Sequence, residues 1–115
     1  MYKLIALDID GTLLNSEKKV TDEVFNAIQK AKEKGVKVVL STGRPLPGVQ
    51  SLLKELKLND EENYVVTFNG GLVQEITSQN VISNIEMSHE DFDYIYNELA
   101  KKHDIKIHIN TPDSL

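Results

Sequence analysis

The stretch Leu4-Ile-Ala-Leu-Asp8-Ile-Asp10-Gly11-Thr12-Leu-Leu14 decides the fold of this chain. A short apolar run leads directly into two carboxylates that are separated by one residue. Apolar runs of this length are typical of a strand buried on both faces, as in a parallel sheet covered by helices. Because side chains alternate along a strand, Asp8 and Asp10 point the same way if the strand extends to Asp10. Two such acids resist joint ionisation unless a cation or hydrogen-bond donors lie between them.

A hairpin turn is the alternative interpretation of this stretch. An Asp-Gly pair such as Asp10-Gly11 often closes two antiparallel strands. That interpretation does not account for Asp8, and the residues after Gly11 do not return at once as a pairing strand. A functional role for the two acids is therefore favoured.

The composition describes an ordinary globular domain. The chain has 115 residues, of which 40% are hydrophobic and 27% are charged; this is long enough to bury a core. The net charge of -5, without a long basic cluster, argues against nucleic acid as a partner. The absence of cysteine excludes disulfides and thiolate metal sites. No signal peptide and no segment of membrane-spanning length is recognised, so a cytoplasmic location is expected.

The residues after the first strand predict a βαβ unit. Thr21 is suited to cap a helix with acids in its first turn, and Gly35 is suited to end it. The β-branched run 36–40 predicts a second buried strand, parallel to the first. The apolar stripe expected on the helix consists of Val20, Val24, Ala27, Ile28 and Ala31.

A second unit of this kind follows. The second strand ends in Ser41-Thr-Gly-Arg-Pro45, and a helix with an apolar face comes next. Residues 64–68 predict a third strand, which ends in the hairpin signal Asn69-Gly70 before a returning strand at 72–76. The inner face of the helix is expected to carry Val49, Leu52, Leu53 and Leu56.

The pattern changes near residues 78–82. The segment 81–87 alternates as a half-exposed strand, Ser88 is suited to cap a helix, and 105–109 alternates again. The helix between them carries the apolar stripe Phe92, Ile95, Tyr96 and Leu99, which is interpreted as core. The sequence therefore predicts one α/β unit over 1–80 and the beginning of another over 81–115. No metal role is assigned to His89, His103 or His108 because their spacing does not suit ligands.

Polar side chains follow all three predicted parallel strands. In doubly wound sheets, ligands bind outside the carboxyl ends of such strands. Asp8 and Asp10 suit a hard cation of the Mg²⁺ type, and one acid could instead act as a nucleophile. The hydroxyls, the backbone near Gly43 and the Arg44 guanidinium suit a phosphate. Together they indicate phosphoryl chemistry, although a surface ion-pair role for Arg44 and a loop-stabilising role for Thr12 remain alternatives.

These motifs resemble those of a known family. Asp8-Ile-Asp10-Gly11-Thr12-Leu13 is similar to the first motif of the haloacid dehalogenase-like (HAD) phosphohydrolases, and Ser41-Thr-Gly-Arg44 is similar to their second. The Thr-Gly-Arg form, with Asn69-Gly70 after the third strand, resembles the Cof-type sugar-phosphate phosphatase branch. The resemblance implies a partial doubly wound, Rossmann-like parallel sheet over 1–80. It also implies the truncated start of an α+β cap domain over 81–115.

The resemblance implies a role for each site residue. Asp8 would be the nucleophile that forms an aspartyl-phosphate, and Asp10 the general acid and then the base, protonated in the first step. Mg²⁺ would be held by the Asp8 carboxylate and the Asp10 main-chain carbonyl. Thr42 and Gly43 would bind the phosphoryl oxygens, and Arg44 and Asn69 would contact the substrate, a small phosphorylated metabolite such as a sugar phosphate.

The same resemblance implies that parts are missing. Family members need a third-motif lysine and further aspartates beyond the cap, and nothing after Asn110, Asp113 included, resembles them. The chain is therefore expected to be an N-terminal piece that is weakly active or inactive alone. With the other half absent, Leu4 to Leu7 would form an exposed sheet edge, which predicts a homodimer through that edge.

Two other classes of protein are alternatives. A non-catalytic dimerisation or binding module that kept half of a phosphatase core would have the same motifs. A receiver-like signalling domain is similar in length but needs an aspartate at the end of the third strand, where this chain has Asn69.

Overall fold

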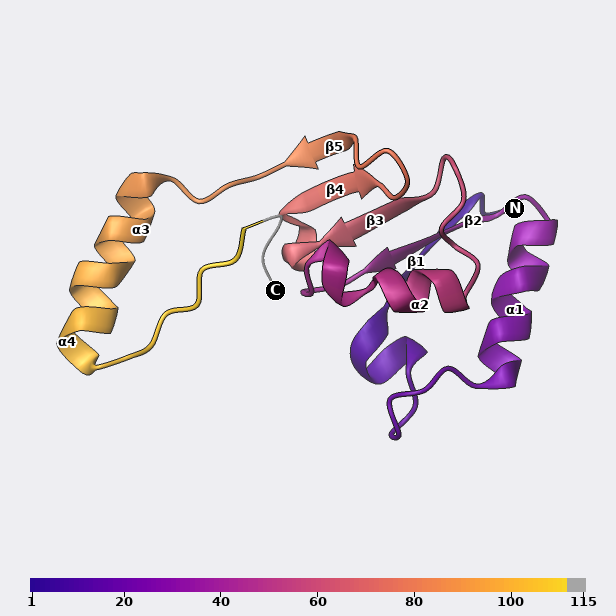
Figure 1. Cartoon of the computed structure of the whole chain (residues 1–115), viewed down its shortest axis with the longest axis horizontal. Coiled ribbons are helices and arrows are strands. Elements are labelled where there is room, and N and C mark those ends of the chain that lie inside the picture. The colour runs from indigo at the N-terminus through magenta and orange to yellow at the C-terminus, as the bar shows by residue number, and fades with distance from the viewer. Residues whose placement is uncertain (112–115) are drawn as a thin grey trace.

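The computed structural model describes residues 1–111 (Figure 1). Five strands alternate first with helices and then with turns, and a helical segment follows the last strand. In chain order the elements are β1 (Leu4–Asp8), α1 (Asp22–Glu33), β2 (Lys37–Ser41), α2 (Gln50–Glu55), β3 (Tyr64–Thr67), β4 (Leu72–Glu75), β5 (Val81–Asn84) and α3 (His89–Ile95). The helical segment continues through Tyr96–Ala100 into α4 (Lys101–His103).

The strands form one mixed sheet in the order β1-β2-β3-β4-β5. The first three strands are parallel, so the predicted βαβ unit and the α/β class are confirmed. Strand β4 pairs antiparallel with β3, which confirms the hairpin predicted at Asn69-Gly70. Strand β5 extends the sheet antiparallel to β4. The three parallel carboxyl ends therefore lie at one edge of the sheet.

A single core lies between the sheet and the helices α1 and α2. The two helices are joined by a hydrogen bond of 2.8 Å from Gln29 Nε2 to the Leu56 carbonyl. As predicted, the Thr21 hydroxyl caps α1 by accepting from Val24 N. The four residues expected on the inner face of the second helix are buried, although α2 itself begins only at Gln50, after a short turn at Leu46–Gly48. The core contains further buried apolar residues around Ile28, Val38, Leu40, Leu53, Leu56 and Val65.

The prediction that the first strand is buried on both faces is wrong. Leu4 is 55% exposed and Ile5 is 39% exposed. Strand β1 is an edge strand, and no described element covers the face that carries Leu4 and Ala6. Its other face, with Ile5 and Leu7, borders an apolar hollow of about 290 Å³ beside α1. Strand β2 is buried on both faces, because its consecutive residues Val38, Val39 and Leu40 are all buried.

The segment after β4 matches the expectations in part. Strand β5 begins at Val81, and Ser88 caps α3 by accepting from Asp91 N at 3.0 Å. The strand predicted at 105–109 is not formed: these residues are extended but pair with no strand. A strand is stable only when its backbone groups find a partner, and no described strand runs beside this segment. The division between residues 80 and 81 stays a prediction.

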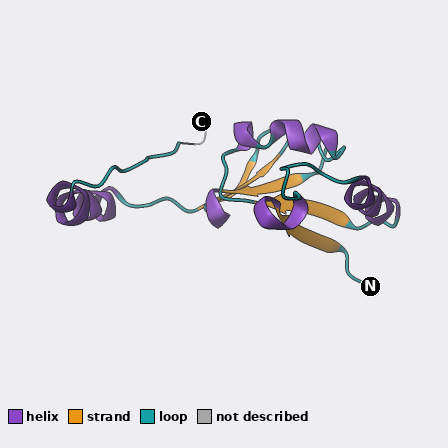
Figure 2. Ribbon diagram, turned by 90° about the horizontal axis from the view of Figure 1, so that it is seen from below, coloured by secondary structure: helices purple, strands orange, loops and turns teal. Residues whose placement is uncertain are grey.

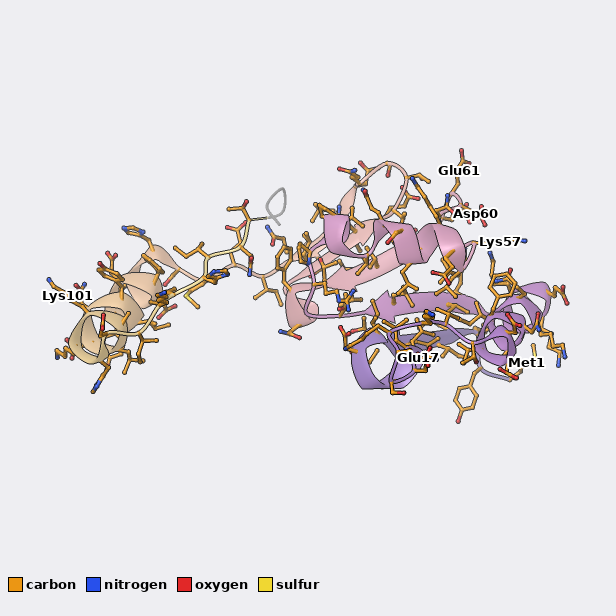
Figure 3. The ribbon with its side chains drawn as sticks, turned by 60° about the horizontal axis from the view of Figure 1, so that its bottom comes forward. Met1, Glu17, Lys57, Asp60, Glu61 and Lys101 are labelled. Atoms are coloured by element: carbon orange, nitrogen blue, oxygen red, sulfur yellow. The ribbon has the colours of Figure 1, made fainter. Side chains whose placement is uncertain are left out.

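The helical segment stands apart from the sheet. In Figure 2 the strands form one twisted layer, and the helix that follows β5 lies away from it. Figure 3 shows Lys101 at the end of this segment far from the side chains of the sheet. A hollow of about 670 Å³ separates the extended residues after α4 from the chain that leads into α3. Within residues 1–111, no helix is long and apolar enough to cross a bilayer.

Candidate active site

The carboxyl ends of β1, β2 and β3 meet at one edge of the sheet. Asp8 lies opposite Ser41 in the pairing of β1 with β2, and Ser41 lies opposite Val66 in the next pair. Beyond the strands, Thr42 N donates to the Val66 carbonyl at 2.9 Å, and Asn69 N donates to the Thr42 carbonyl at 3.0 Å. The backbone thus brings together residues that are far apart in the sequence.

The chain turns sharply after Asp8. Residues Ile9–Leu13 form a single wide turn, closed by a 3.1 Å hydrogen bond from Leu14 N to the Ile9 carbonyl. Gly11 adopts a φ of 81°, in the left-handed region that glycine enters without steric cost. Ile9 and Leu13 are buried by this turn. Asp10 therefore leaves the strand, and its side chain does not follow the alternation expected from an extended β1.

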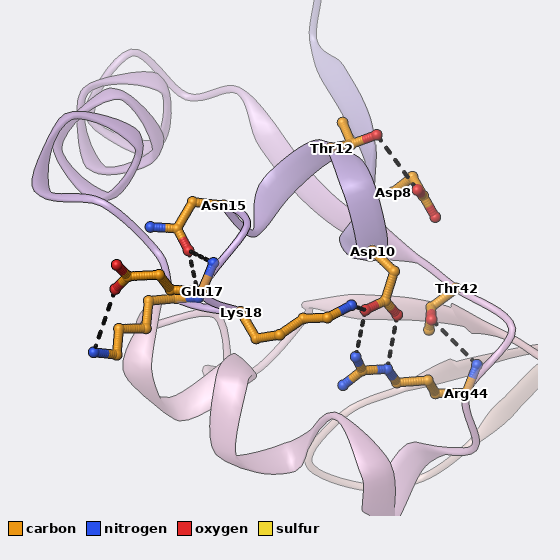
Figure 4. A network of polar contacts seen from close by, with 9 residues as sticks. Asp8, Asp10, Thr12, Asn15, Glu17, Lys18, Thr42 and Arg44 are labelled. Carbon is orange, nitrogen blue, oxygen red and sulfur yellow. Dashed lines mark hydrogen bonds and ion pairs between the residues drawn. The ribbon is translucent and has the colours of Figure 1, made fainter.

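Asp10 is bound by two cations (Figure 4). Arg44 binds both of its carboxylate oxygens, with Nη2 2.7 Å from Oδ1 and Nε 3.0 Å from Oδ2. Lys18 Nζ lies 3.3 Å from Oδ1. The hydrogen bond from Arg44, followed by that from Lys18, lowers the pKa of Asp10 below its ordinary value. The expected protonated form of Asp10 is therefore disfavoured in this arrangement, because the two cations outweigh the opposing effect of desolvation on the pKa.

Lys18 was not among the residues predicted for the site. It lies in the polar loop after the first motif, where a charged residue is ordinarily solvated. The only signal in the sequence is Asn15, whose side-chain oxygen accepts hydrogen bonds from Glu17 N at 3.0 Å and Lys19 N at 2.9 Å. Asn and Asp side chains often stabilise turns in this way. The turn directs Lys18 toward Asp10.

Asp8 and Thr42 have separate local partners. The Thr12 hydroxyl donates to Asp8 Oδ2 at 3.4 Å, a long contact that supports the predicted loop-stabilising role of Thr12. The Thr42 hydroxyl accepts a hydrogen bond of 3.1 Å from Arg44 N, and Thr42 is buried. A hydroxyl that accepts one bond still has its own proton to donate.

Gly43 and Asn69 are in close contact. A Cβ at position 43 would lie 2.9 Å from Asn69 Oδ1 and 3.2 Å from Asn69 Nδ2. Asn69 has a φ of 55°, which asparagine tolerates better than most residues. Glycine at position 43 thus allows the amide of Asn69 to lie against the loop that follows β2. All six predicted site residues lie at this edge of the sheet: Asp8 at the end of β1, and Asp10, Thr42, Gly43, Arg44 and Asn69 in the turns and loops that follow the strands.

The donor set at this edge suits a hard cation but is incomplete. Asp8 offers a carboxylate as a ligand. Both carboxylate oxygens of Asp10 are bound by Arg44, so the main-chain carbonyl of Asp10 is the oxygen that it can offer to a cation. Among residues 1–111, no group of three or more acids or histidines is placed to hold a metal. Asp113, considered above, lies outside the described residues. Carboxylate and carbonyl oxygens are ligand types that hard cations prefer.

The chain belongs to the haloacid dehalogenase-like hydrolase family, whose model matches residues 5–115. A protein of Streptococcus pyogenes serotype M6 whose name describes a phosphatase is 46% identical over 114 residues, which are 98% of this chain and 42% of that protein. The 5-amino-6-(5-phospho-D-ribitylamino)uracil phosphatase YcsE of Bacillus subtilis is 38% identical and matches 95% of this chain and 42% of its own length.

The fold agrees with this assignment. The crystal structure of a haloacid dehalogenase-like hydrolase from Bacteroides thetaiotaomicron superposes with a TM-score of 0.74 at 32% identity, over 89% of this chain and 38% of that one. The chain therefore spans about two fifths of the length of the relatives it matches, 42% for both proteins above.

Proposed function

We propose that this chain carries the nucleophile half of a phosphomonoester hydrolase. One observation supports this most strongly: the turn after β1 holds Asp8 and Asp10 at the edge where the Thr42–Arg44 loop follows β2. Phosphoryl transfer depends on positioning and charge stabilisation, and this edge offers acids and cations within hydrogen-bond distance of one another. Small phosphorylated metabolites of the cytoplasm, sugar phosphates first among them, are the proposed substrates.

The proposed chemistry has two steps. Asp8 attacks phosphorus, the bond from phosphorus to the ester oxygen breaks, and the leaving alkoxide takes a proton from Asp10. Water then attacks the aspartyl-phosphate, gives a proton to Asp10 and releases inorganic phosphate from Asp8. The cations beside Asp10 favour its ionised form, which suits the second step. The first step requires Arg44 to move from Asp10 toward the phosphate.

The loop after β2 is proposed to bind the phosphoryl group. The Thr42 hydroxyl accepts from Arg44 N, so its own proton is available to a phosphate oxygen. The Gly43 N–H lies in the same loop, and a guanidinium such as that of Arg44 is suited to paired contacts with phosphate. Asn69 contributes an amide beside Gly43.

Magnesium is the proposed cofactor. The Asp8 carboxylate and the Asp10 main-chain carbonyl would hold it, and it would neutralise negative charge on the phosphoryl group. Mg²⁺ takes about six ligands, so water, substrate and further protein oxygens would supply the others. The ion pair of Asp10 with Arg44 is compatible with this assignment, because the proposed ligand from Asp10 is its carbonyl.

The names of the relatives support a phosphatase, and the small-molecule substrate class is our proposal. YcsE is named for a phosphorylated ribitylamino compound, whose sugar-alcohol phosphate is of the proposed type. Because this chain spans two fifths of such relatives, we propose that full activity needs the remaining part of the fold.

A second candidate function rests on β1. Among the described residues this strand pairs only with β2, and its residues are largely exposed. An open strand edge is a template for pairing with another chain. We propose as the alternative that the chain acts as a dimerisation or binding module that uses this edge.

An aryl phosphate assay separates the two functions. Hydrolysis of p-nitrophenyl phosphate is measured with and without Mg²⁺. The samples are this chain alone and this chain mixed with the C-terminal part of YcsE, which this chain does not match. The phosphatase proposal expects Mg²⁺-dependent activity in at least one of these samples, abolished by Asp8→Asn and retained in the exposed control Asp22→Asn. Activity that survives Asp8→Asn, or no activity in either sample, would contradict it.

A further inference from the structure

The loop between Asn15 and Lys19 is closed by four hydrogen bonds. Besides the two accepted by the Asn15 side chain, Asn15 N donates to the Lys19 carbonyl at 3.0 Å and Lys18 N donates to the Asn15 carbonyl at 3.0 Å. Lys18 has a φ of 61° within this loop, a conformation that costs energy in any residue other than glycine. The loop is thus held in one shape although it lies at the surface.

The loop turns its two lysines in different directions. Lys18 Nζ lies 3.3 Å from Asp10 Oδ1, whereas Lys19 Nζ lies 3.7 Å from its neighbour Glu17. The Lys18 side chain is 70% exposed, so its ammonium group is open to a ligand while it touches Asp10. Figure 4 shows Lys18 and Arg44 approaching Asp10 from different elements.

The position of Lys18 beside Asp10 indicates which part of a bound substrate its ammonium group would contact. In the proposed reaction Asp10 exchanges its proton with the ester oxygen of the leaving group. Lys18 and Arg44 both contact the Asp10 carboxylate, but Lys18 comes from the loop after β1 and not from the phosphate-binding loop after β2, so it is the cation assigned to the leaving-group side. The Thr42–Gly43 loop, on the end of β2, is on the phosphoryl side. Arg44 lies between the two, because its backbone bonds Thr42 and its side chain bonds Asp10.

We propose that Lys18 is a specificity-determining residue that binds an acidic group of the leaving alcohol. This inference rests on the proposed phosphatase function and adds a substrate class to it: phosphate esters whose alcohol carries a carboxylate within two or three atoms of the ester oxygen. A flexible ammonium on a rigid loop can reach such a carboxylate while it remains near Asp10. An aryl or purely hydroxylated leaving group gives it no anion to bind.

Ligand binding to the chain tests this proposal without requiring turnover. Affinities for inorganic phosphate, phenyl phosphate and phosphoglycolate are measured by NMR titration of backbone amides in a buffer that contains Mg²⁺. Wild type is expected to bind phosphoglycolate about two- to fivefold more tightly than phenyl phosphate, the range typical of one exposed ion pair. Lys18→Met should abolish this preference and change the affinity for inorganic phosphate less than about twofold.

Two variants control for charge and for loop structure. Lys19→Met removes the same charge from the same loop and should keep the preference, and Lys18→Arg should keep it as well. If Lys18→Met weakens all three ligands equally, or leaves the preference intact, the assignment of Lys18 is wrong while the phosphatase proposal stands. If inorganic phosphate shifts no amide in the loops that contain Asp8 and Thr42, the phosphatase proposal itself is wrong.

Discussion

Arg44 binds Asp10 through two parallel contacts, from Nη2 to Oδ1 at 2.7 Å and from Nε to Oδ2 at 3.0 Å. The two residues come from the loops after β2 and β1, so this pair joins the two motifs at the sheet edge. The geometry is the paired arrangement that a guanidinium makes with a carboxylate and that a lysine cannot reproduce. The same guanidinium geometry would suit a phosphate, which makes Arg44 central to the proposed chemistry.

Arg44→Gln is expected to raise the pKa of Asp10 toward its ordinary value. Arg44 is the largest cause of the lowered pKa and Lys18 the second, so Lys18→Met should raise it less. Because the pKa is lowered in the folded state, the pair contributes stability that is present above the ordinary pKa and is lost as the pH falls through the lowered value. Titration of the Asp10 carboxyl carbon by NMR measures both variants. An Asp10 pKa that is the same in Arg44→Gln as in wild type would contradict the paired contact.

Gly43→Ala is expected to displace the Asn69 side chain. The new Cβ would lie 2.9 Å from Asn69 Oδ1, closer than real Cβ contacts, and the amide must move to relieve the overlap. Because only a side-chain end moves, the free energy of unfolding should fall by less than about 1 kcal/mol. Phosphate binding should weaken if Asn69 contacts the substrate. In an Asn69→Ala background the same substitution should have no further effect on binding, which a double-mutant cycle measures.

Glu75 is expected to make the protein sensitive to acid. Hydrogen bonds from Ser78 and Thr77 lower the pKa of Glu75 from 4.5 to about 2. Its contribution to stability is therefore complete above pH 4.5 and is lost as the pH falls toward 2. Urea unfolding between pH 6 and pH 2 should show a smaller loss of stability in Glu75→Gln than in wild type. Equal losses in the two proteins would show that this turn does not hold the carboxylate as described.

Leu4→Lys is expected to reduce self-association of the chain. Leu4 is 55% exposed on the open edge strand β1, and lysine on an edge opposes strand pairing. Sedimentation should show dimers of the wild type that Leu4→Lys shifts toward monomer. Met87→Lys is the matched control, because Met87 is 62% exposed but lies outside β1. A wild type that stays monomeric at high concentration would contradict the proposed homodimer.

The features that could be predicted from the sequence depend on local patterns. The apolar run before Asp8, the Thr21 cap and the Asn69-Gly70 signal each identify an element whose neighbours are adjacent in the chain, and all three are observed. The meeting of the strand ends followed from the parallel order. These inferences needed no knowledge of side-chain partners.

The features that could not be predicted depend on what lies beside a segment in space. The apolar pattern of β1 alone predicts burial on both faces, and the exposed edge at Leu4 follows only from the family resemblance. The segment 105–109 has no described strand to pair with. The charge state of Asp10 depends on Arg44 and Lys18, which lie 34 and 8 residues away in the chain. Lys18 itself was missed because a lysine in a polar loop looks like any solvated charge.

The central claim is that Asp8 forms the bond to phosphorus at the edge where the three parallel strands end. Beryllofluoride mimics a phosphoryl group on an aspartate, and ¹⁹F NMR with Mg²⁺ present detects the adduct directly. Our account predicts a bound signal in wild type and in Asp22→Asn, accompanied by amide shifts at Thr42 and Gly43, and no bound signal in Asp8→Asn. An adduct that persists in Asp8→Asn, or wild-type chain that forms none, would contradict it.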